Sequence, residues 1–200
     1  MISMDTYEIV MDIINKNNGI ISTAEIVNQN IDRKYLSIMV QRGMIERASR
    51  GVYVLPHIME DELYSISIRC RKGTFSHDTA LFLHDLSDRT PLRFSITLPK
   101  GYNPSSLKNE ALDFFYVKPE LLPLGMIKVL SPHGKPIQTY DIERTICDIV
   151  RSKSRMDMQI FTEALKRYSK RKDKDLSILM KYAKTFKIEK KMREYMEVLI

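Results

Sequence analysis

Side chains that can bond a polyanion gather between residues 32 and 50. The set consists of Arg33, Lys34, Ser37, Gln41, Arg42, Arg47 and Arg50. Arginine, lysine and glutamine bond base edges in the major groove of DNA, and arginine and lysine also hold phosphates. We expect base contacts from Arg33, Lys34 and Gln41, and phosphate contacts from Arg42, Arg47 and Arg50. The stretch from Asp32 to Arg50 has five basic and two acidic residues, so it is locally positive.

Two histidines raise the question of catalysis or metal binding. His77-Asp78 and His84-Asp85 are seven residues apart, which would place both imidazoles on one side of a helix. Metal or proton chemistry needs a third ligand, or a second acid or base, with recognisable spacing, and none lies nearby. Ser76-His77 also suits the capped start of a helix. We therefore expect no enzymatic activity, no metal and no cofactor.

The other reactive residue types favour structural roles. Four charged residues have helical spacing and are expected to form local ion pairs: Asp141, Glu143, Arg144 and Asp148. Cys70 and Cys147 lie 77 positions apart in apolar segments, which predicts buried free thiols. The sequence has no phosphate-binding Gly-rich loop, no nucleophile elbow and no Cys/His zinc pattern.

Short helices are expected to position the donor set. Apolar residues recur at helical spacing over residues 5–16, and Asn17-Asn18-Gly19 ends this first helix. Ser22 and Glu25 have the spacing of a capping box, which opens a second helix through about Val27. A third helix follows after a turn of four to five residues.

The third helix begins after Asp32 and ends at Gly43, with apolar side chains on one face and donors on the other. Residues 44–47 and 52–55 alternate as strands around Ala48-Ser49-Arg50-Gly51, which predicts a hairpin. Two helices with a polar second helix, followed by a hairpin, indicate a winged helix-turn-helix. Because the whole segment has no net charge, docking to a protein remains an alternative to DNA binding.

The rest of the chain predicts a larger, mixed domain. A helix over 57–73 would connect the two domains, and a second helix follows over 78–86. Strands are expected at 93–98, 112–117, 125–129 and 137–140, and helices at 141–150, 157–169, 174–186 and 189–199. The predicted class is α+β: a winged helix-turn-helix domain at 1–56, then a C-terminal domain at 57–200 with a small sheet to about 140 and a helical bundle after it.

Positive charge concentrates at the end of the chain. The net charge is +7, and residues 151–200 contain fifteen basic and seven acidic groups. The cluster includes Lys166, Lys170, Arg171, Lys172, Lys184, Lys187, Lys190 and Lys191. Such a face is either simply solvated or a second contact for DNA or another polyanion. No apolar run reaches membrane-spanning length and the first helix is acidic, so we expect a cytoplasmic protein without membrane contact.

Three motifs in sequence order resemble the AbiEi antitoxin family of type IV toxin–antitoxin systems. They are Arg-Gly-Val-Tyr (50–53), Ser-His-Asp-Thr-Ala-Leu-Phe-Leu-His-Asp-Leu-Ser-Asp-Arg (76–89) and Thr-Tyr-Asp-Ile-Glu-Arg-Thr-Ile-Cys-Asp (139–148). The resemblance covers almost the whole chain. It implies an autorepressor that binds inverted repeats in the promoter of its own operon. It also implies a C-terminal domain that counteracts a cognate nucleotidyltransferase toxin without a stable complex, as in abortive infection and phage defence.

A second hypothesis is a winged-helix regulator whose C-terminal domain senses a ligand or partner and has no toxin. A toxin gene beside this one would favour the first hypothesis. Inverted repeats can be filled by a dimer or by cooperative monomers. The sequence has no exposed heptad seam, which favours a monomer in solution that binds DNA cooperatively.

Overall fold

The chain forms two compact units. The structure is a computed structural model and describes residues 4–104, 107 and 111–199. Unit 1 consists of Met1–Arg71 and Leu130–Ile137, and unit 2 of Lys72–Val129 and Gln138–Ile200. The first unit thus extends past residue 56 and gains a short segment from much later in the chain. The domain boundary expected after residue 56 stays a prediction.

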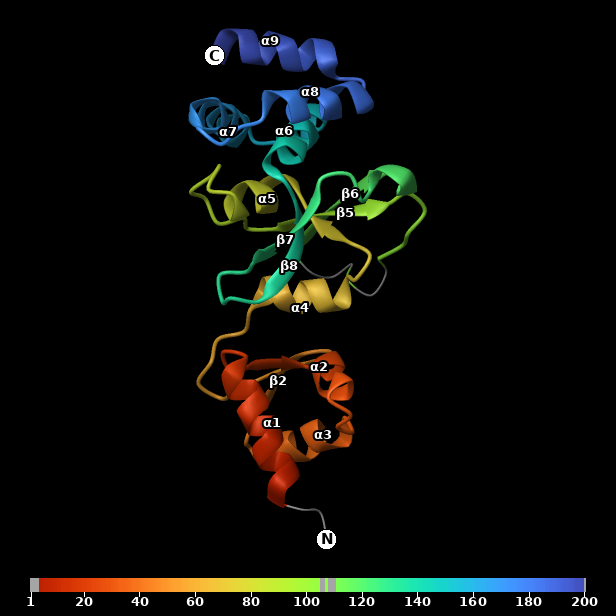
Figure 1. Cartoon of the computed structure of the whole chain (residues 1–200), viewed down its shortest axis with the longest axis vertical. Helices are drawn as coiled ribbons and strands as arrows, with labels where there is room; N and C mark the ends of the chain where they lie inside the picture. The colour runs from red at the N-terminus through yellow and green to blue at the C-terminus, as the bar shows by residue number, and fades with distance from the viewer. Residues whose placement is uncertain (1–3, 105–106, 108–110, 200) are drawn as a thin grey trace. The chain divides into compact units, whose positions relative to one another are not determined.

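Unit 1 contains four helices and a small sheet in its described residues (Figure 1). The elements are α1 (Met4–Lys16), β1 (Ile20–Ser22), α2 (Thr23–Asn28), α3 (Lys34–Gln41), β2 (Glu46–Ser49), β3 (Val52–Val54) and α4 (Glu62–Arg69). The strands are antiparallel in the order β1-β3-β2. Strand β1, which the sequence did not predict, completes the sheet by pairing Ile20 with Val54. Helices α1, α2 and α3 pack their apolar faces together around Ile14, Leu36 and Met39.

Local signals set the ends of these helices. Asn18 and Gly19 have φ angles of +57° and +76°, and this left-handed backbone ends α1 as expected. The capping box at α2 is confirmed, since the Ser22 hydroxyl and the Glu25 backbone N–H are 3.2 Å apart and the Glu25 carboxylate accepts from the Ser22 N–H at 2.7 Å. Helix α4 begins at residue 62 instead of 57 because Asp61 caps it, accepting from the backbone N–H of the third helical residue.

Unit 2 combines a five-stranded sheet with helices (Figure 1). Its strands are β4 (Thr74–Phe75), β5 (Phe94–Pro99), β6 (Leu112–Val117), β7 (Met126–Leu130) and β8 (Pro136–Tyr140). Their order is β6-β5-β4-β8-β7, with β5 and β6 parallel and β4 and β5 antiparallel. The two-residue strand β4, also absent from the predicted elements, is the central strand and joins β5 to β8. The end of β7, the following turn and the start of β8 are the segment counted in unit 1.

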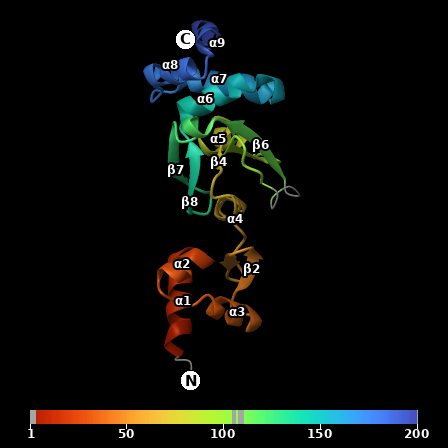
Figure 2. The same ribbon diagram turned by 90° about the vertical axis from the view of Figure 1, so that its right-hand side faces the viewer.

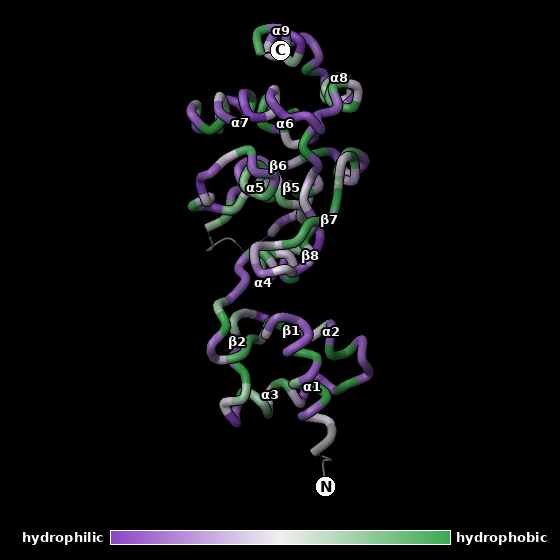
Figure 3. Tube along the Cα trace, turned by 60° about the vertical axis from the view of Figure 1, so that its left-hand side comes forward, coloured by the Kyte–Doolittle hydropathy of each residue, from purple (hydrophilic) through white to green (hydrophobic). Residues whose placement is uncertain are grey.

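Helices make up the rest of unit 2. They are α5 (His77–Leu83), α6 (Ile142–Arg151), α7 (Met158–Lys170), α8 (Leu176–Thr185) and α9 (Glu189–Leu199), with single 3-10 turns at Pro119–Leu121 and Lys153–Arg155. In Figures 1 and 2 the last four helices stack at one end of the sheet. Hydrophobic and hydrophilic stretches alternate along α7 and α9 (Figure 3), as expected of helices buried on one side. The predicted α+β class is confirmed.

Candidate nucleic-acid interface

Helix α3 presents one polar stripe to solvent. Leu36 and Met39 are fully buried and fix the rotation of the helix in the core of unit 1. Arg33, Ser37 and Gln41, spaced four residues apart, are exposed along the opposite side. The stripe carries guanidinium, hydroxyl and amide groups, a donor and acceptor set that suits base edges.

Two other cations beside the stripe already have neighbours. The Lys34 ammonium lies 3.6 Å from the Asp32 carboxylate, and both groups are more than half exposed. An exposed pair of this kind contributes little to stability, so exchanging it for a phosphate costs little. The Arg42 guanidinium lies over the Tyr7 ring at 4.7 Å from its centroid, and Tyr7 meets Tyr35 edge to face. Arg42 is therefore held against α1 instead of extending freely.

The wing carries two further cations. Arg47 is exposed on β2, and Arg50 is exposed at the turn between β2 and β3. Gly51 follows with a φ of +81°, a conformation that favours glycine, and its carbonyl accepts from the Thr23 N–H at 2.9 Å. Arg33, Arg47 and Arg50 have no ion-pair partner among the described residues. The predicted donor set is thus exposed on α3 and on the hairpin that follows it.

The predicted basic cluster of the last helices divides into two kinds of side chain. Seven lysines are exposed: Lys166, Lys170, Lys172, Lys184, Lys187, Lys190 and Lys191. Arg171 differs, because its guanidinium pairs with Asp173 at 2.7 Å and donates to the His84 carbonyl at 3.1 Å. The hydrogen bonds to Asp173 raise the pKa of Arg171. Arg171 therefore holds the turn after α7, and the lysines supply the outward charge.

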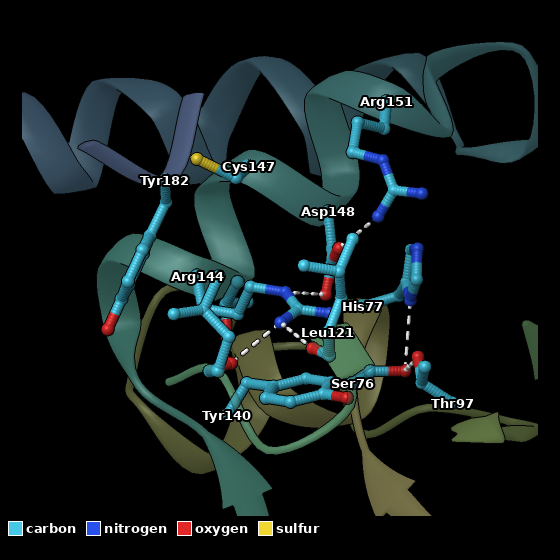
Figure 4. A network of polar contacts seen from close by, with 12 residues as sticks. Ser76, His77, Thr97, Leu121, Tyr140, Arg144, Cys147, Asp148, Arg151 and Tyr182 are labelled. Carbon is cyan, nitrogen blue, oxygen red and sulfur yellow. Dashed lines mark hydrogen bonds and ion pairs between the residues drawn. The ribbon is translucent and has the colours of Figure 1, made fainter. Parts of the chain in front are cut away.

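His77 is committed to the fold of unit 2. Its ring is 3% exposed and stacks on Phe115 with centroids 3.4 Å apart. The ring nitrogens lie 2.9 Å from the Ser76 hydroxyl and 3.0 Å from the Ser152 hydroxyl, and Thr97 donates to Ser76 (Figure 4). Burial, assisted by nearby arginines, holds the pKa of His77 well below its usual range. Ser76 is the N-cap residue of α5, but its hydroxyl bonds these side chains instead of the helix backbone.

His84 does not join His77 in a site. It is the C-cap residue of α5, and its Nε2 lies 2.6 Å from the Tyr140 carbonyl. Burial lowers the pKa of His84 as well. No group of three or more His, Cys, Asp or Glu in residues 4–104, 107 and 111–199 is arranged to hold a metal ion. Cys70 and Cys147 are buried, as predicted, and no disulfide joins them.

A buried ion pair lies at the centre of α6 (Figure 4). Arg144, which is fully buried, places its Nε 3.0 Å from Asp148 and donates to the Leu121 and Leu124 carbonyls. Arg151 adds a second contact to Asp148 at 2.9 Å. Burial raises the pKa of the Asp148 carboxyl, and the two guanidinium groups oppose that change. The predicted local ion pair is confirmed for Arg144 and Asp148. Asp141 and Glu143 have other roles, since Asp141 caps α6 and Glu143 accepts from the Asp175 N–H at 2.9 Å.

A cavity of about 320 Å³ in unit 2 is lined by charged and apolar groups. Asp78, Arg89, Arg93 and Asp113 line it together with Leu92 and Ile160. Arg89 already bonds Gln159 of α7, and Arg93 pairs with Asp113 at 2.9 Å. The volume lies at the lower limit of pockets that hold small molecules. Sequence reasoning missed this cavity because it brings together residues from separate segments.

The order α1, α2, α3 and hairpin β2–β3, with exposed cations on α3 and the hairpin, is the order predicted for a winged helix-turn-helix. Residues 8–56 match the model of a family described as "Transcriptional regulator, AbiEi antitoxin". The predicted resemblance to AbiEi antitoxins is confirmed over these residues, and the match supports an antitoxin-type transcriptional regulator.

A solved structure matches most of the chain. The RV2827C protein from Mycobacterium tuberculosis aligns with a TM-score of 0.58 and 12% identity, over 92% of this chain and 72% of that chain. At this identity the likeness shows the fold alone. Comparison with curated proteins finds no match. None of the helices in the part of the chain that the structure describes is long and apolar enough to span a membrane.

Proposed function

We propose that the protein is a type IV antitoxin and a transcriptional autorepressor. In this proposal α3 and the wing bind inverted repeats in the promoter of its own operon, and unit 2 counteracts a cognate nucleotidyltransferase toxin. The observation that carries the proposal is the family match over residues 8–56, the same residues that expose Arg33 at the N-cap of α3 and Arg50 on the wing. We propose that the protein is a monomer in solution, binds cooperatively to DNA and forms no stable complex with the toxin. Catalytic activity is not part of this function.

The DNA-binding part is tested on the full-length protein. We expect Arg33→Ala and Arg50→Ala each to weaken binding to promoter DNA and to raise expression from the promoter. Arg33→Ala is expected to cost about 1–3 kcal/mol and to relax base preference, because Arg33 lies on the stripe of α3. Arg50→Ala is expected to weaken binding to DNA of every sequence by the same factor. It should also lower the slope of log affinity against log salt concentration by about one. Unchanged affinity of both variants at matched salt would remove α3 and the wing from the interface.

Antitoxicity is tested separately, by co-expression of the toxin with the double variant Arg33→Ala/Arg50→Ala. We expect this variant to protect cells while its own promoter is derepressed, because the substitutions leave unit 2 untouched. Loss of protection at equal protein level would show that repression and antitoxicity depend on the same residues.

The exposed lysines of α7 to α9 are proposed as a second polyanion contact that adds affinity without sequence preference. Phosphate contacts of this kind add to the salt dependence of binding. Arg171 adds charge there but is already paired with Asp173. A test of this contact therefore replaces Lys170 and Lys172 and keeps Arg171.

The second candidate function is a winged-helix regulator that senses a small ligand and has no toxin. The observation that favours it is the cavity beside Asp78, in which one carboxylate oxygen is buried without a hydrogen-bond partner among the described residues. If the gene has no toxin neighbour and Asp78→Asn alters repression without changing the affinity of the purified protein for DNA, this candidate replaces the first.

A further inference from the structure

A buried lysine lies beneath the helix-turn-helix of unit 1. The Lys135 side chain is 4% exposed, and its ammonium donates to the Ile20 carbonyl of β1 at 2.9 Å. The same ammonium lies 3.8 Å from Glu25 and 5.3 Å from the centre of the Tyr64 ring. Burial lowers the pKa of Lys135, and the charges of Glu25 and Asp61 oppose that change. Burying an ammonium is costly, so its partners must hold it in a defined place.

The carboxylate of Glu25 joins this lysine to the start of α2. One oxygen accepts from the backbone N–H and the hydroxyl of Ser22, each at 2.7 Å, and from the Tyr64 hydroxyl at 2.9 Å. The other oxygen faces Lys135. The capping box of α2 is therefore one side of a larger network that includes α4 and residues 130–137.

The segment that carries Lys135 is fastened to unit 1 at two more points. The Ser131 hydroxyl bonds the carboxylate of Asp61, the residue that caps α4. Asn18, at the end of α1, donates to the His133 carbonyl at 3.3 Å. Gly134 has a φ of +78°, and a Cβ there would lie 3.0 Å from the Asn18 side-chain amide. Separate contacts with α1, β1, α2 and α4 make this segment an integral part of unit 1.

The network continues from Glu25 to the wing. Ser22, whose N–H and hydroxyl are bonded by Glu25, pairs with Val52 of β3. The next residue, Thr23, donates its N–H to the Gly51 carbonyl at 2.9 Å. Gly51 follows Arg50 at the turn of the wing. A short chain of contacts thus runs from the Lys135 ammonium through Glu25 and the start of α2 to the backbone beside Arg50.

We propose that Lys135 is a positioning residue for the wing: it fixes Glu25, and through Glu25 the backbone of Gly51 and Arg50. The inference rests on the proposed function for its effect on DNA binding. Because its side chain is buried, Lys135 contacts no phosphate and acts only through these residues. Residues 130–137 thereby help to form a DNA interface whose cations lie 80 residues or more earlier in the sequence.

The test uses the full-length protein with Lys135→Met, which keeps an unbranched side chain one atom shorter and removes its charge. We expect roughly tenfold weaker binding to promoter DNA, in the range of couplings within one network, with the salt slope unchanged. Arg50→Ala, in contrast, lowers the slope by about one, because it removes a phosphate contact. Lys128→Met is the matched control, since Lys128 is exposed on β7 and its loss removes the same charge without touching Glu25.

A second measurement separates positioning from general stability and needs no DNA. In amide NMR spectra of the folded protein, we expect the resonances of Arg50 and Gly51 to move in Lys135→Met and to stay in place in Lys128→Met. If Lys135→Met does not fold, Lys135→Gln replaces it, because the amide keeps a donor for the Ile20 carbonyl.

Unmoved wing resonances in a folded variant overturn the proposal, and so does unchanged DNA affinity when the wild type binds. A salt slope that falls as in Arg50→Ala also overturns it, because Lys135 would then contact DNA itself. If the wild type binds no promoter DNA, the proposed function fails, while the resonances of the wing still decide whether Lys135 positions it.

Discussion

The two units use arginine in opposite ways. In unit 2, ion pairs join six arginines to acidic partners: Arg93, Arg144, Arg151, Arg167, Arg171 and Arg193. In unit 1, Arg33, Arg47 and Arg50 have no ion-pair partner among the residues that the structure describes. A guanidinium that already bonds a carboxylate offers few donors to an external anion, whereas an unpaired one offers its full planar set. The excess positive charge lies in unit 2, so the net charge alone would not point to the candidate interface of unit 1.

Some arginines of unit 2 also protect the edge of its sheet. Arg93 donates to the Leu112 carbonyl and Arg155 to the Phe114 carbonyl, both on strand β6. Strand β6 lies at the end of the sheet order, where unpaired carbonyls invite pairing with another chain. These guanidinium groups therefore satisfy two backbone carbonyls of an edge strand. The outward charge of the last helices is carried mainly by lysine. The lysine ammonium is a point charge on a flexible chain, which suits binding to an anion without a fixed geometry.

The largest effect is expected from the buried pair of unit 2. Arg144→Met leaves Asp148 buried beside only Arg151 and removes the bonds to the carbonyls of Leu121 and Leu124. We expect the free energy of unfolding to fall by about 3–5 kcal/mol, measured by urea denaturation. Replacing both partners, in Arg144→Met/Asp148→Leu, should restore part of this loss. A loss below about 1 kcal/mol in the single variant would mean that this arginine is as dispensable as an exposed one.

A pH dependence is expected from His77. Its pKa is about 6.5 in the unfolded chain and well below that in the folded protein, because the ring is buried. Below about pH 6.5 the unfolded chain therefore binds a proton that the folded protein excludes, so the free energy of unfolding falls as pH falls, by up to about 1.4 kcal/mol per pH unit. His84, whose pKa is also lowered by burial, acts in the same direction.

His77→Asn tests this dependence. Asparagine tolerates the φ of +47° at this position and does not titrate. We expect a lower stability at pH 7, from the lost contact with Phe115, and a smaller further loss between pH 7 and pH 5 than in the wild type. Titratable groups that both proteins share, including Asp148, contribute equally to the two stability curves, so their contributions cancel when one curve is subtracted from the other. Parallel stability curves for the two proteins would contradict a neutral, buried His77.

Periodic segments could be predicted from the sequence, and short or distant pairings could not. Helices α6, α7 and α9 begin within one residue of their expected starts because Asp141, Asp157 and the apolar spacing mark them. Strands β1 and β4 have three and two residues, too few to show alternation, and each is defined by a partner far away in sequence. Helix α5 ends at Leu83, earlier than expected, because Asp85 takes a left-handed φ of +56°.

The candidate interface was predictable because its residues lie within one short stretch of chain. The amphipathic pattern of α3 assigns Arg33 and Gln41 to the outer face, and Gly51 marks the turn beside Arg50. Lys135 was not predictable, since the carbonyl that accepts its hydrogen bond lies 115 residues earlier in the chain. No local pattern distinguishes a buried lysine after Pro132-His133-Gly134 from one on a solvated turn.

The exposed lysines of unit 2 should act in DNA binding and not in stability. Replacing Lys170 and Lys172 by glutamine leaves Arg171 bonded to Asp173 and His84, so the turn after α7 stays intact. We expect the salt slope of DNA binding to fall by one to two if both lysines contact phosphates, with stability changed by less than about 0.5 kcal/mol. Binding curves at several salt concentrations measure this, with Lys118→Gln as an exposed control. An unchanged slope would make these lysines a solvated face.

The smallest effect is expected from an exposed arginine pair of unit 2. Arg193 pairs with Glu189 one turn earlier on α9 at 2.9 Å, and the two side chains are 61% and 40% exposed. Pairs of this kind on a helix contribute about 0.3–0.5 kcal/mol. Arg193→Met should therefore lower the free energy of unfolding by no more than this, roughly a tenth of the effect of Arg144→Met, and the difference should shrink further at high salt. A loss above about 1 kcal/mol would show that an exposed ion pair, without burial, is enough for an arginine of unit 2 to stabilise the fold.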